Sequence, residues 1–123
     1  MAFFSRTKNS GMTDAPMRVE CEQIGAECRV SLSGRITIDS SPDLRDDLLG
    51  RLETPNCCIL TLDLYDVAYI DTSGLAIMVE ILRAARRRGK AFHLSRLGER
   101  PRYLLETTRL LHLFENETPT SPT

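Results

Sequence analysis

Residues 57–88 decide the fold, and they read CCILTLDLYDVAYIDTSGLAIMVEILRAARRR. The first eight, Cys57–Leu64, are nearly all apolar, which predicts a strand buried on both faces. Such strands lie in the middle of sheets that carry helices. From about Ser73 to Arg88 the apolar residues recur at helical spacing, and Gly89 follows as a C-terminal cap. A buried strand followed by an amphipathic helix favours an α/β domain.

The flanking segments extend this unit in both directions. Upstream, Met17–Ser33 alternates with period two around Gly25, which predicts a hairpin that Gly34 ends. Ser41 then serves as the N-cap of a helix that Pro55 follows, with Pro42 in its first turn. Four leucines form the apolar stripe of this helix: Leu44, Leu48, Leu49 and Leu52.

Downstream, a further strand, a helix and a short last strand are expected, over Ala91–Leu94, Pro101–Leu111 and Leu113–Phe114. The expected architecture is therefore a single α/β domain, a mixed β-sheet packed against helices.

The length of 123 residues fits one domain, and both ends of the chain differ from its middle. Residues 1–16 are polar and contain glycine, which predicts a flexible N-terminal tail. Residues 118–123 contain two prolines and no apolar side chain, which predicts a disordered C-terminal tail. The folded domain is expected over residues 17–117.

Composition excludes several classes of function. The formal net charge is -1, which gives no electrostatic case for a nucleic-acid partner. No apolar run approaches the roughly 20 residues that span a bilayer, so no direct membrane insertion is expected and the cytoplasm is the expected location.

The four cysteines, Cys21, Cys28, Cys57 and Cys58, have no zinc-ligand spacing, so no metal site and no cofactor is expected. Cys21 and Cys28 face each other across the hairpin and fit two small core side chains better than a disulfide. Cys57 and Cys58 are interpreted as packing residues.

The run Asp71-Thr72-Ser73-Gly74-Leu75 combines reactive groups with a position that presents them, at the junction of strand and helix. As plain structure, Asp71 or Thr72 is a good N-cap for the helix. Gly74, however, lies in the first turn, where glycine costs up to about 1 kcal/mol relative to alanine, and it suits the close approach of a partner. On residue types alone, a helix cap and a functional site remain equal alternatives.

Two further features of the same helix leave alternatives open. Ile77, Ile81 and Ala84 form a second apolar row, which is either part of a wide core stripe or a partner-binding face. Five cations crowd the helix end and fit a solvated face that complements the helix dipole; the alternative is an acidic partner or a membrane surface. They are Arg83, Arg86, Arg87, Arg88 and Lys90.

With these residues in view, the chain resembles the STAS domain family (sulfate transporter and anti-sigma factor antagonist). The residues that carry the likeness are Leu62–Leu64, Val67–Ile70 and Asp71–Leu75, and it extends over roughly residues 17–115. Within the family, the chain looks most like the bacterial anti-sigma factor antagonists. The resemblance implies a binding module, not an enzyme, with no catalytic residues.

The resemblance also implies a mechanism and partners. An anti-sigma factor with serine/threonine kinase activity is bound by the unphosphorylated protein and phosphorylates Thr72, with Ser73 as the alternative; a phosphatase reverses this. The loop after Gly34 joins the partner surface, although Thr37 stands where many relatives carry aspartate. The alternative from the same fold is the STAS subunit of a phospholipid-transport ABC complex, which docks on the transporter ATPase. The expected partner-binding residues are Thr37, Asp39, Ser40, Asp71, Thr72, Ser73, Gly74, Leu75, Ile77 and Ile81.

Overall fold

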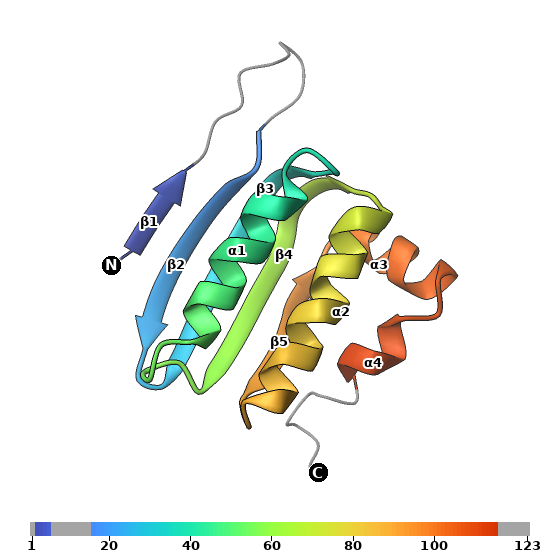
Figure 1. Cartoon of the computed structure of the whole chain (residues 1–123). Coiled ribbons are helices and arrows are strands. Elements are labelled where there is room, and N and C mark those ends of the chain that lie inside the picture. The colour runs from blue at the N-terminus through green and yellow to red at the C-terminus, as the bar shows by residue number, and fades with distance from the viewer. Residues whose placement is uncertain (1, 6–15, 116–123) are drawn as a thin grey trace.

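The computed structural model describes residues 2–5 and 16–115, and these form one mixed five-stranded sheet with helices packed against it (Figure 1). The strands lie in the sheet in chain order, β1-β2-β3-β4-β5. β2 (Arg18–Ile24) and β3 (Glu27–Ile36) form the antiparallel hairpin expected around Gly25. β3, β4 (Ile59–Ile70) and β5 (Ala91–Leu97) are parallel, with β4 in the middle.

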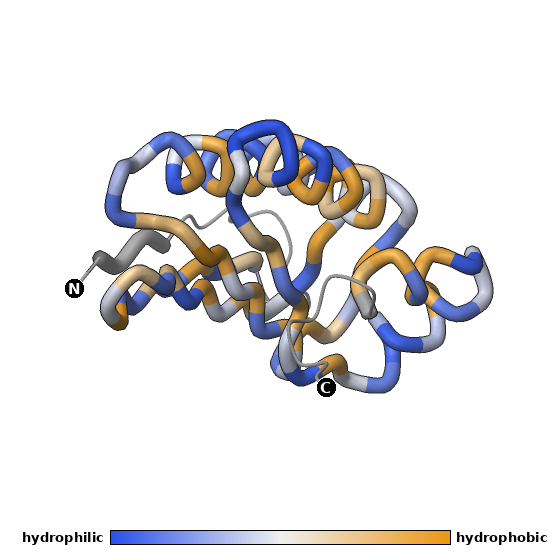
Figure 2. Tube along the Cα trace, turned by 90° about the horizontal axis from the view of Figure 1, so that it is seen from below, coloured by the Kyte–Doolittle hydropathy of each residue, from blue (hydrophilic) through white to orange (hydrophobic). Residues whose placement is uncertain are grey.

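Helices α1 (Ser41–Leu52) and α2 (Thr72–Arg87) make the two crossovers between the parallel strands. They lie side by side on one face of the sheet, with their apolar sides turned toward it (Figure 2). Helices α3 (Glu99–Thr107) and α4 (Leu111–Glu115) follow β5 and pack at its side of the domain. Both crossover helices therefore begin at the carboxyl ends of the parallel strands.

The core lies between this helix pair and the sheet. Leu44, Leu48 and Leu52 of α1 have no exposed surface, and Leu60 and Leu62 of β4 are equally buried. Burying one leucine fully stabilises a fold by about 1.5–3 kcal/mol, so this layer is the main source of stability. None of the helices in the described ranges is long and apolar enough to span a membrane.

The expected fold class is confirmed, but the ends of the chain differ from the prediction. Ala2–Ser5 forms β1, an edge strand that pairs with β2, so the predicted flexible tail is wrong for these four residues. Their backbone pairing satisfies β2 on its outer side, which composition did not reveal. The remaining tail residues, 1, 6–15 and 116–123, lie outside the described residues, and the boundaries 17–117 stay a prediction.

Several element boundaries also needed correction. β3 does not end at Gly34, because that glycine adopts a positive φ of 88° at a register irregularity and the strand continues to Ile36. The N-cap of α1 is Ser40, while Ser41 is the first helical residue. The long last helix expected to Leu111 ends at Thr107, and the short strand expected at Leu113–Phe114 is helix α4.

The cysteines follow the simpler interpretation, with one exception. Cys21 and Cys28 are buried free thiols whose sulfurs lie 2.9 Å apart and share a hydrogen bond. Burial, reinforced by that hydrogen bond, raises the pKa of Cys21 to about 11, so the thiol stays protonated at neutral pH. Cys57 is buried as expected, but Cys58 is exposed, and both residues precede β4.

Candidate functional site

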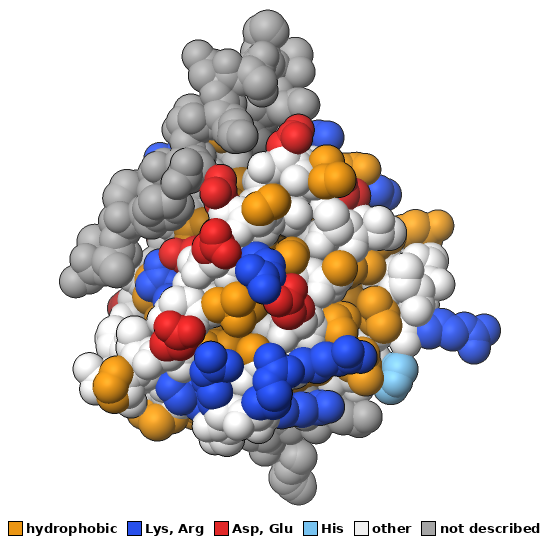
Figure 3. All heavy atoms as spheres, in the orientation of Figure 1, with side chains coloured by type: hydrophobic (Ala, Val, Ile, Leu, Met, Phe, Trp, Pro, Cys, Tyr) orange, Lys and Arg blue, Asp and Glu red, His pale blue; other side chains and the backbone are white. Residues whose placement is uncertain are grey.

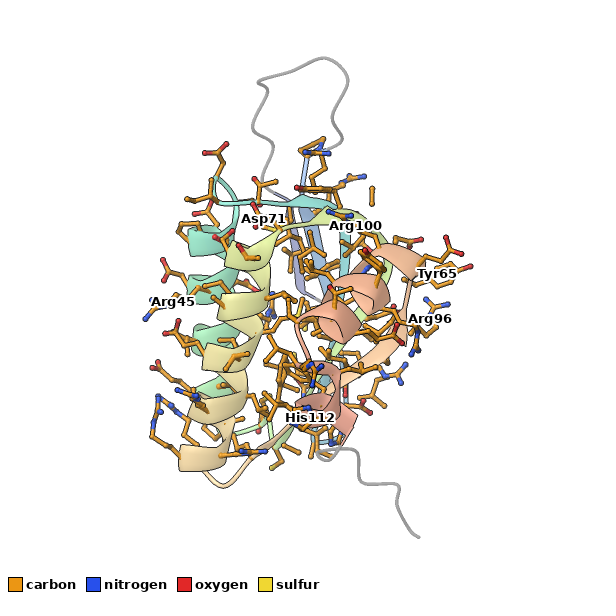
Figure 4. The ribbon with its side chains drawn as sticks, turned by 90° about the vertical axis from the view of Figure 1, so that its right-hand side faces the viewer. Arg45, Tyr65, Asp71, Arg96, Arg100 and His112 are labelled. Atoms are coloured by element: carbon orange, nitrogen blue, oxygen red, sulfur yellow. The ribbon has the colours of Figure 1, made fainter. Side chains whose placement is uncertain are left out.

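The run Asp71–Leu75 lies where the central strand β4 passes directly into α2, at the same end of the domain as the start of α1. Figure 4 shows Asp71 at this end of the helix pair, far from His112 at the other end. The backbone N–H of Asp71 donates to the carbonyl of Ile36 at 3.1 Å, which continues the β3–β4 pairing to the first residue of the run. The site is therefore anchored to the centre of the sheet.

Asp71 is the N-cap of α2. Its Oδ1 accepts hydrogen bonds from the backbone N–H groups of Ser73 at 3.0 Å and Gly74 at 3.3 Å. The Ser73 hydroxyl donates to the same oxygen at 2.5 Å. The expectation that Asp71 or Thr72 caps the helix is confirmed for Asp71.

The ionised form of Asp71 is favoured by this arrangement. Partial burial alone would raise its pKa, but hydrogen bonds from the Ser73 hydroxyl and from the N–H groups of Gly74, Ser73 and Ile38 outweigh burial. Together they hold the pKa of Asp71 below its usual value. The Asp71 carboxylate is therefore negatively charged at neutral pH.

The two hydroxyl residues that follow differ in availability. Thr72 is exposed, and within the described part of the chain its hydroxyl has no hydrogen-bond partner. Ser73 is half-buried, and its hydroxyl is bound to the cap carboxylate. A reagent from solution therefore reaches the Thr72 hydroxyl without breaking a contact, whereas modification of Ser73 would remove a hydrogen bond from the cap.

Gly74 is required by the packing of the fold. The interpretation that this glycine allows a partner to approach closely is therefore wrong. The residue is buried, and a Cβ added to it would lie 2.7 Å from Cγ1 of Ile70 and 2.9 Å from Cγ2 of Ile36. These distances are shorter than real carbon contacts, so the last side chains of β3 and β4 require a glycine here. The close approach is internal: the first turn of α2 lies directly on the sheet.

The loop between β3 and α1 lies beside the start of α2. Thr37 and Ser40 shape it, because the Ser40 hydroxyl accepts from the Thr37 N–H at 3.0 Å and the Thr37 hydroxyl accepts from the Asp39 N–H at 3.2 Å. Asp39 is exposed. The structure thus brings together three of the loop residues expected at the site with Asp71 and Thr72.

Sequence reasoning left Ile38 out of the site. Its side chain is 71% exposed, the largest exposure among the exposed large apolar residues of the described chain. Ile38 stands two residues after Ile36, whose carbonyl accepts the N–H of Asp71, so its loop lies next to the start of α2. The sequence does contain a signal: Ile38 lies between Thr37 and Asp39 in a polar loop, where an apolar side chain is not needed for the core.

Three of the expected partner-binding residues face the interior instead. Leu75 is 3% exposed and Ile81 is fully buried, so neither side chain can contact a partner in this structure, and Gly74 is buried as described above. Ile77 is partly buried and packs against the core. The second apolar row is buried because α2 packs against α1 as well as against the sheet, and this confirms the wide core stripe.

The remaining carboxylates of β4 do not form an acid pair with Asp71. Asp63 binds Arg96, whose Nε and Nη2 lie 3.1 and 2.7 Å from its Oδ2. The guanidinium of Arg96 also lies 4.8 Å from the ring centre of Tyr65, on the side of the molecule away from Asp71 (Figure 4). Over the described ranges, no group of three His, Cys, Asp or Glu side chains is arranged to hold a metal ion.

Comparison with known protein families identifies the family of this chain. The family model described as "Mlab, STAS domain" matches residues 19–115. The chain belongs to the STAS domain family. This STAS domain is 28% identical over 99 residues to the anti-sigma-B factor antagonist of Bacillus subtilis (strain 168), a match that covers 80% of this chain and 89% of the relative.

Two solved structures show the same fold. The unphosphorylated form of the anti-sigma factor antagonist SpoIIAA matches with a TM-score of 0.66 and 13% identity, over 75% of this chain and 81% of that one. An anti-sigma factor antagonist from Mycobacterium paratuberculosis matches with a TM-score of 0.65 and 24% identity, over 87% of this chain and 86% of that one. Both support the architecture described above.

Proposed function

We propose that this STAS domain is an anti-sigma factor antagonist that is switched by phosphorylation at Thr72. In the unphosphorylated state it binds an anti-sigma factor kinase and so frees a sigma factor; phosphorylation ends the binding, and a phosphatase restores it. It acts in the cytoplasm as a binding regulator and not as an enzyme. The relative from Bacillus subtilis, an anti-sigma-B factor antagonist, supports this class of function.

The observation that carries the proposal is the exposed hydroxyl of Thr72, which has no hydrogen-bond partner in the described part of the chain, together with the exposed Ile38 on the loop that meets the start of α2. An apolar side chain on a polar loop is typical of the centre of a protein interface. Asp71 connects the two segments, because its N–H donates to the carbonyl of Ile36, two residues before Ile38, and its carboxylate caps the helix that Thr72 begins. A phosphate on Thr72 therefore lies within the surface that a partner covers.

The physical effect of such a phosphate falls on the partner more than on the fold. A phosphothreonine carries nearly two negative charges at pH 7, and the positive end of the α2 dipole tolerates them. The phosphate would add to the negative charge of Asp71, the residue before it, and of the exposed Asp39 on the neighbouring loop. An apolar or acidic partner surface would then have to bury or approach this charge, which is unfavourable.

The experiment compares the tagged full chain with its Thr72→Glu variant. We expect the wild-type chain to copurify a kinase-like anti-sigma protein, and Thr72→Glu to weaken that binding at least tenfold in calorimetry while thermal stability changes little. Incubation with the copurified kinase and ATP should place the phosphate on Thr72, as mapped by mass spectrometry. The matched control is Thr107→Glu, which adds the same charge to exposed α3 and should leave binding intact.

Ile38→Ala supplies an independent check of the surface. Because the side chain is mostly exposed, its removal should weaken partner binding without loss of stability. Phosphate found on Ser73 instead, or equal binding by wild type and Thr72→Glu, would refute the switch. Copurification of a transporter ATPase would favour the phospholipid-transport alternative.

A further inference from the structure

Two of the four cysteines meet on the face of the β2–β3 hairpin that the helices cover. The sulfur of Cys21 on β2 lies 2.9 Å from the sulfur of Cys28 on β3, and the two residues are only 7% and 3% exposed. Cys21 pairs in the strand register with Val30, two residues along β3 from Cys28, so the thiols form a diagonal pair on one face of the sheet. Neither thiol belongs to the surface proposed for the partner.

A third thiol belongs to the same buried cluster. Burial raises the pKa of Cys57, and the thiols of Cys21 and Cys28 both act on it. The charges of Arg51 and Asp47 on α1 act on Cys21 in turn, so the cluster lies beneath that helix. In the space-filling view, packed side chains of the helix layer cover this face of the sheet (Figure 3). A reagent from solution therefore has to reach the pair from another side.

The turn end of the hairpin offers that route. Residues 22–26 form the last part of β2 and the turn, and all of them are exposed. Cys28 is the second residue of β3, so the pair lies directly inside this exposed end. Gln23 fastens the end to the α1–β4 connection, because its Nε2 donates to the carbonyls of Gly25 and Asn56 at 2.9 and 3.0 Å. Local opening of such an end costs far less than global unfolding, and it admits a small reagent.

Core packing does not account for two sulfurs in contact. The neighbouring inward-facing positions of the same hairpin are filled by the apolar residues Val19, Val30 and Leu32. The S–H group is a weak donor, so the hydrogen bond between the thiols adds little to the core. By contrast, the two sulfurs need to approach by only about 0.9 Å to reach the length of a disulfide bond, about 2.05 Å. The arrangement therefore suits a covalent bridge better than it suits packing alone.

We propose that Cys21 and Cys28 are a reversible disulfide site that a hydroperoxide, such as hydrogen peroxide, oxidises. One cysteine attacks the O–O bond as its thiolate, which leaves a sulfenic acid on that cysteine and releases the first water. The second thiol then attacks the sulfenic sulfur, the S–S bond forms, and hydroxide leaves with the thiol proton as the second water. The two thiols lose two hydrogens and two electrons in total, and hydrogen peroxide is reduced to two molecules of water.

The position of the second sulfur decides the product, and the protonation state decides the rate. A sulfenic acid without a neighbouring thiol is oxidised further to sulfinic acid, but here a second sulfur 2.9 Å away captures it first. The thiolate is the attacking form, and the raised pKa of Cys21 keeps that thiol protonated at neutral pH. The pair therefore stays reduced in a reducing compartment and closes under sustained oxidation, faster as the pH rises.

The bridge acts on the hairpin and not on the start of α2. Cys28 stands near the start of β3, whereas Ile36, whose carbonyl binds the Asp71 N–H, ends this strand of 10 residues. At about 3.3 Å per residue, the strand separates the two sites by most of its length of about 33 Å. A bridge around the turn restricts mainly the unfolded chain, so the oxidised fold resists unfolding more strongly. The stability of the domain, and not its affinity for a partner, responds to the oxidant.

The first test maps the products of hydrogen peroxide treatment on the full chain. Trypsin releases Cys21 and Cys28 together in the peptide 19–29, while the other two cysteines fall in a separate peptide. We expect the peptide 19–29 to lose two hydrogens and to escape alkylation, and dithiothreitol to reverse both changes. The variant Cys57→Ala/Cys58→Ala should give the same product. Its matched control, Cys21→Ala/Cys28→Ala, should give no bridge.

The second test asks whether the fold favours the bridge. In a glutathione buffer, one glutathione disulfide is consumed and two glutathione thiols are released for each bridge formed, so the ratio of oxidised to reduced chain gives an equilibrium constant. We expect this constant to be at least about tenfold larger for the folded chain than for the same chain in concentrated urea, because the fold already holds the sulfurs together. Thr72→Glu should give a constant within about twofold of the wild-type value.

Other products would overturn the proposal. These are a sulfinic acid on either cysteine of the pair, a bridge from Cys28 to Cys57, or a peptide 19–29 that stays reduced while the exposed Cys58 is oxidised. An equilibrium constant no larger than the one in urea would mean that the bridge strains the hairpin, and would overturn the proposal as well. Because these measurements contain no partner protein, their outcomes are separate from those of the Thr72 switch.

Discussion

The two ends of α2 use their polar groups in opposite ways. At the start, Asp71 caps the helix and its N–H pairs with the carbonyl of Ile36, and Gly74 packs directly on Ile36 and Ile70. At the end, Arg83 and Arg87 project from the helix without a partner within the described residues. Polar and charged residues at a helix terminus therefore have two kinds of role. Those with contacts to other segments stabilise the fold, and those without such contacts remain available to a partner.

The largest effect is expected from Gly74→Ala, which tests whether the start of α2 packs tightly on the sheet. The new methyl group would overlap Ile36 and Ile70, and overpacking of this kind costs about 1–3 kcal/mol. Alanine is the better helix former by up to about 1 kcal/mol, so a net destabilisation of about 1–2 kcal/mol is expected. Urea unfolding measures it.

Gly50 of α1 provides the matched control. It also lies inside a helix, but a Cβ there would meet no atom within 4 Å. Gly50→Ala should therefore stabilise the fold by about 0.5–1 kcal/mol. If Gly74→Ala were equally stabilising, the close packing of α2 on the sheet would be wrong.

A smaller change in stability is expected from Asp71→Asn, which tests the negative charge of the helix cap. Asparagine keeps the capping oxygen but loses the charge, so at pH 7 the variant should be less stable by under about 1 kcal/mol. Because the pKa of Asp71 is lowered in the folded state, its contribution is complete above the unfolded value near 3.8 and is lost as the pH falls further. The difference in unfolding free energy between the two proteins should shrink below that pH; a constant difference from pH 7 to pH 2.5 would contradict the assignment.

The smallest effect is expected at the other end of the helix. Arg83→Gln/Arg87→Gln removes a like-charge pair and no internal contact, so stability should rise by a few tenths of a kcal/mol at low salt. The gain should vanish at 1 M salt, where exposed charges are screened. A loss of stability would mean that these arginines support the fold.

The sequence predicted most of the layered architecture. The apolar run from Cys57, the leucine stripe of α1 and the hairpin around Gly25 each follow from local periodicity, and the structure confirms all three elements. The cap at Asp71 was also predictable, since its chemistry is contained in neighbouring residues. These features depend on residues that are close together in the sequence, so the sequence alone is enough to predict them.

What escaped prediction depended on contacts between distant segments. The burial of Ile81 follows from the packing of α1 beside α2, and the need for Gly74 follows from Ile36, which is remote in sequence. The exposure of Ile38 follows from the shape of its loop. The pairing of Ala2–Ser5 with β2 likewise depends on the open edge of a sheet that no local pattern describes.

The hydrogen bond from the Asp71 N–H to the Ile36 carbonyl has a consequence for any enzyme that acts on Thr72. Many modifying enzymes bind their substrates as extended peptides, which requires the target segment to leave the fold. Here the target residue follows the last pairing of the central strand and begins a helix, so extending it would unravel the middle of the sheet. A kinase or phosphatase for Thr72 must therefore recognise a folded surface, and a free peptide of residues 67–77 should be a poor substrate.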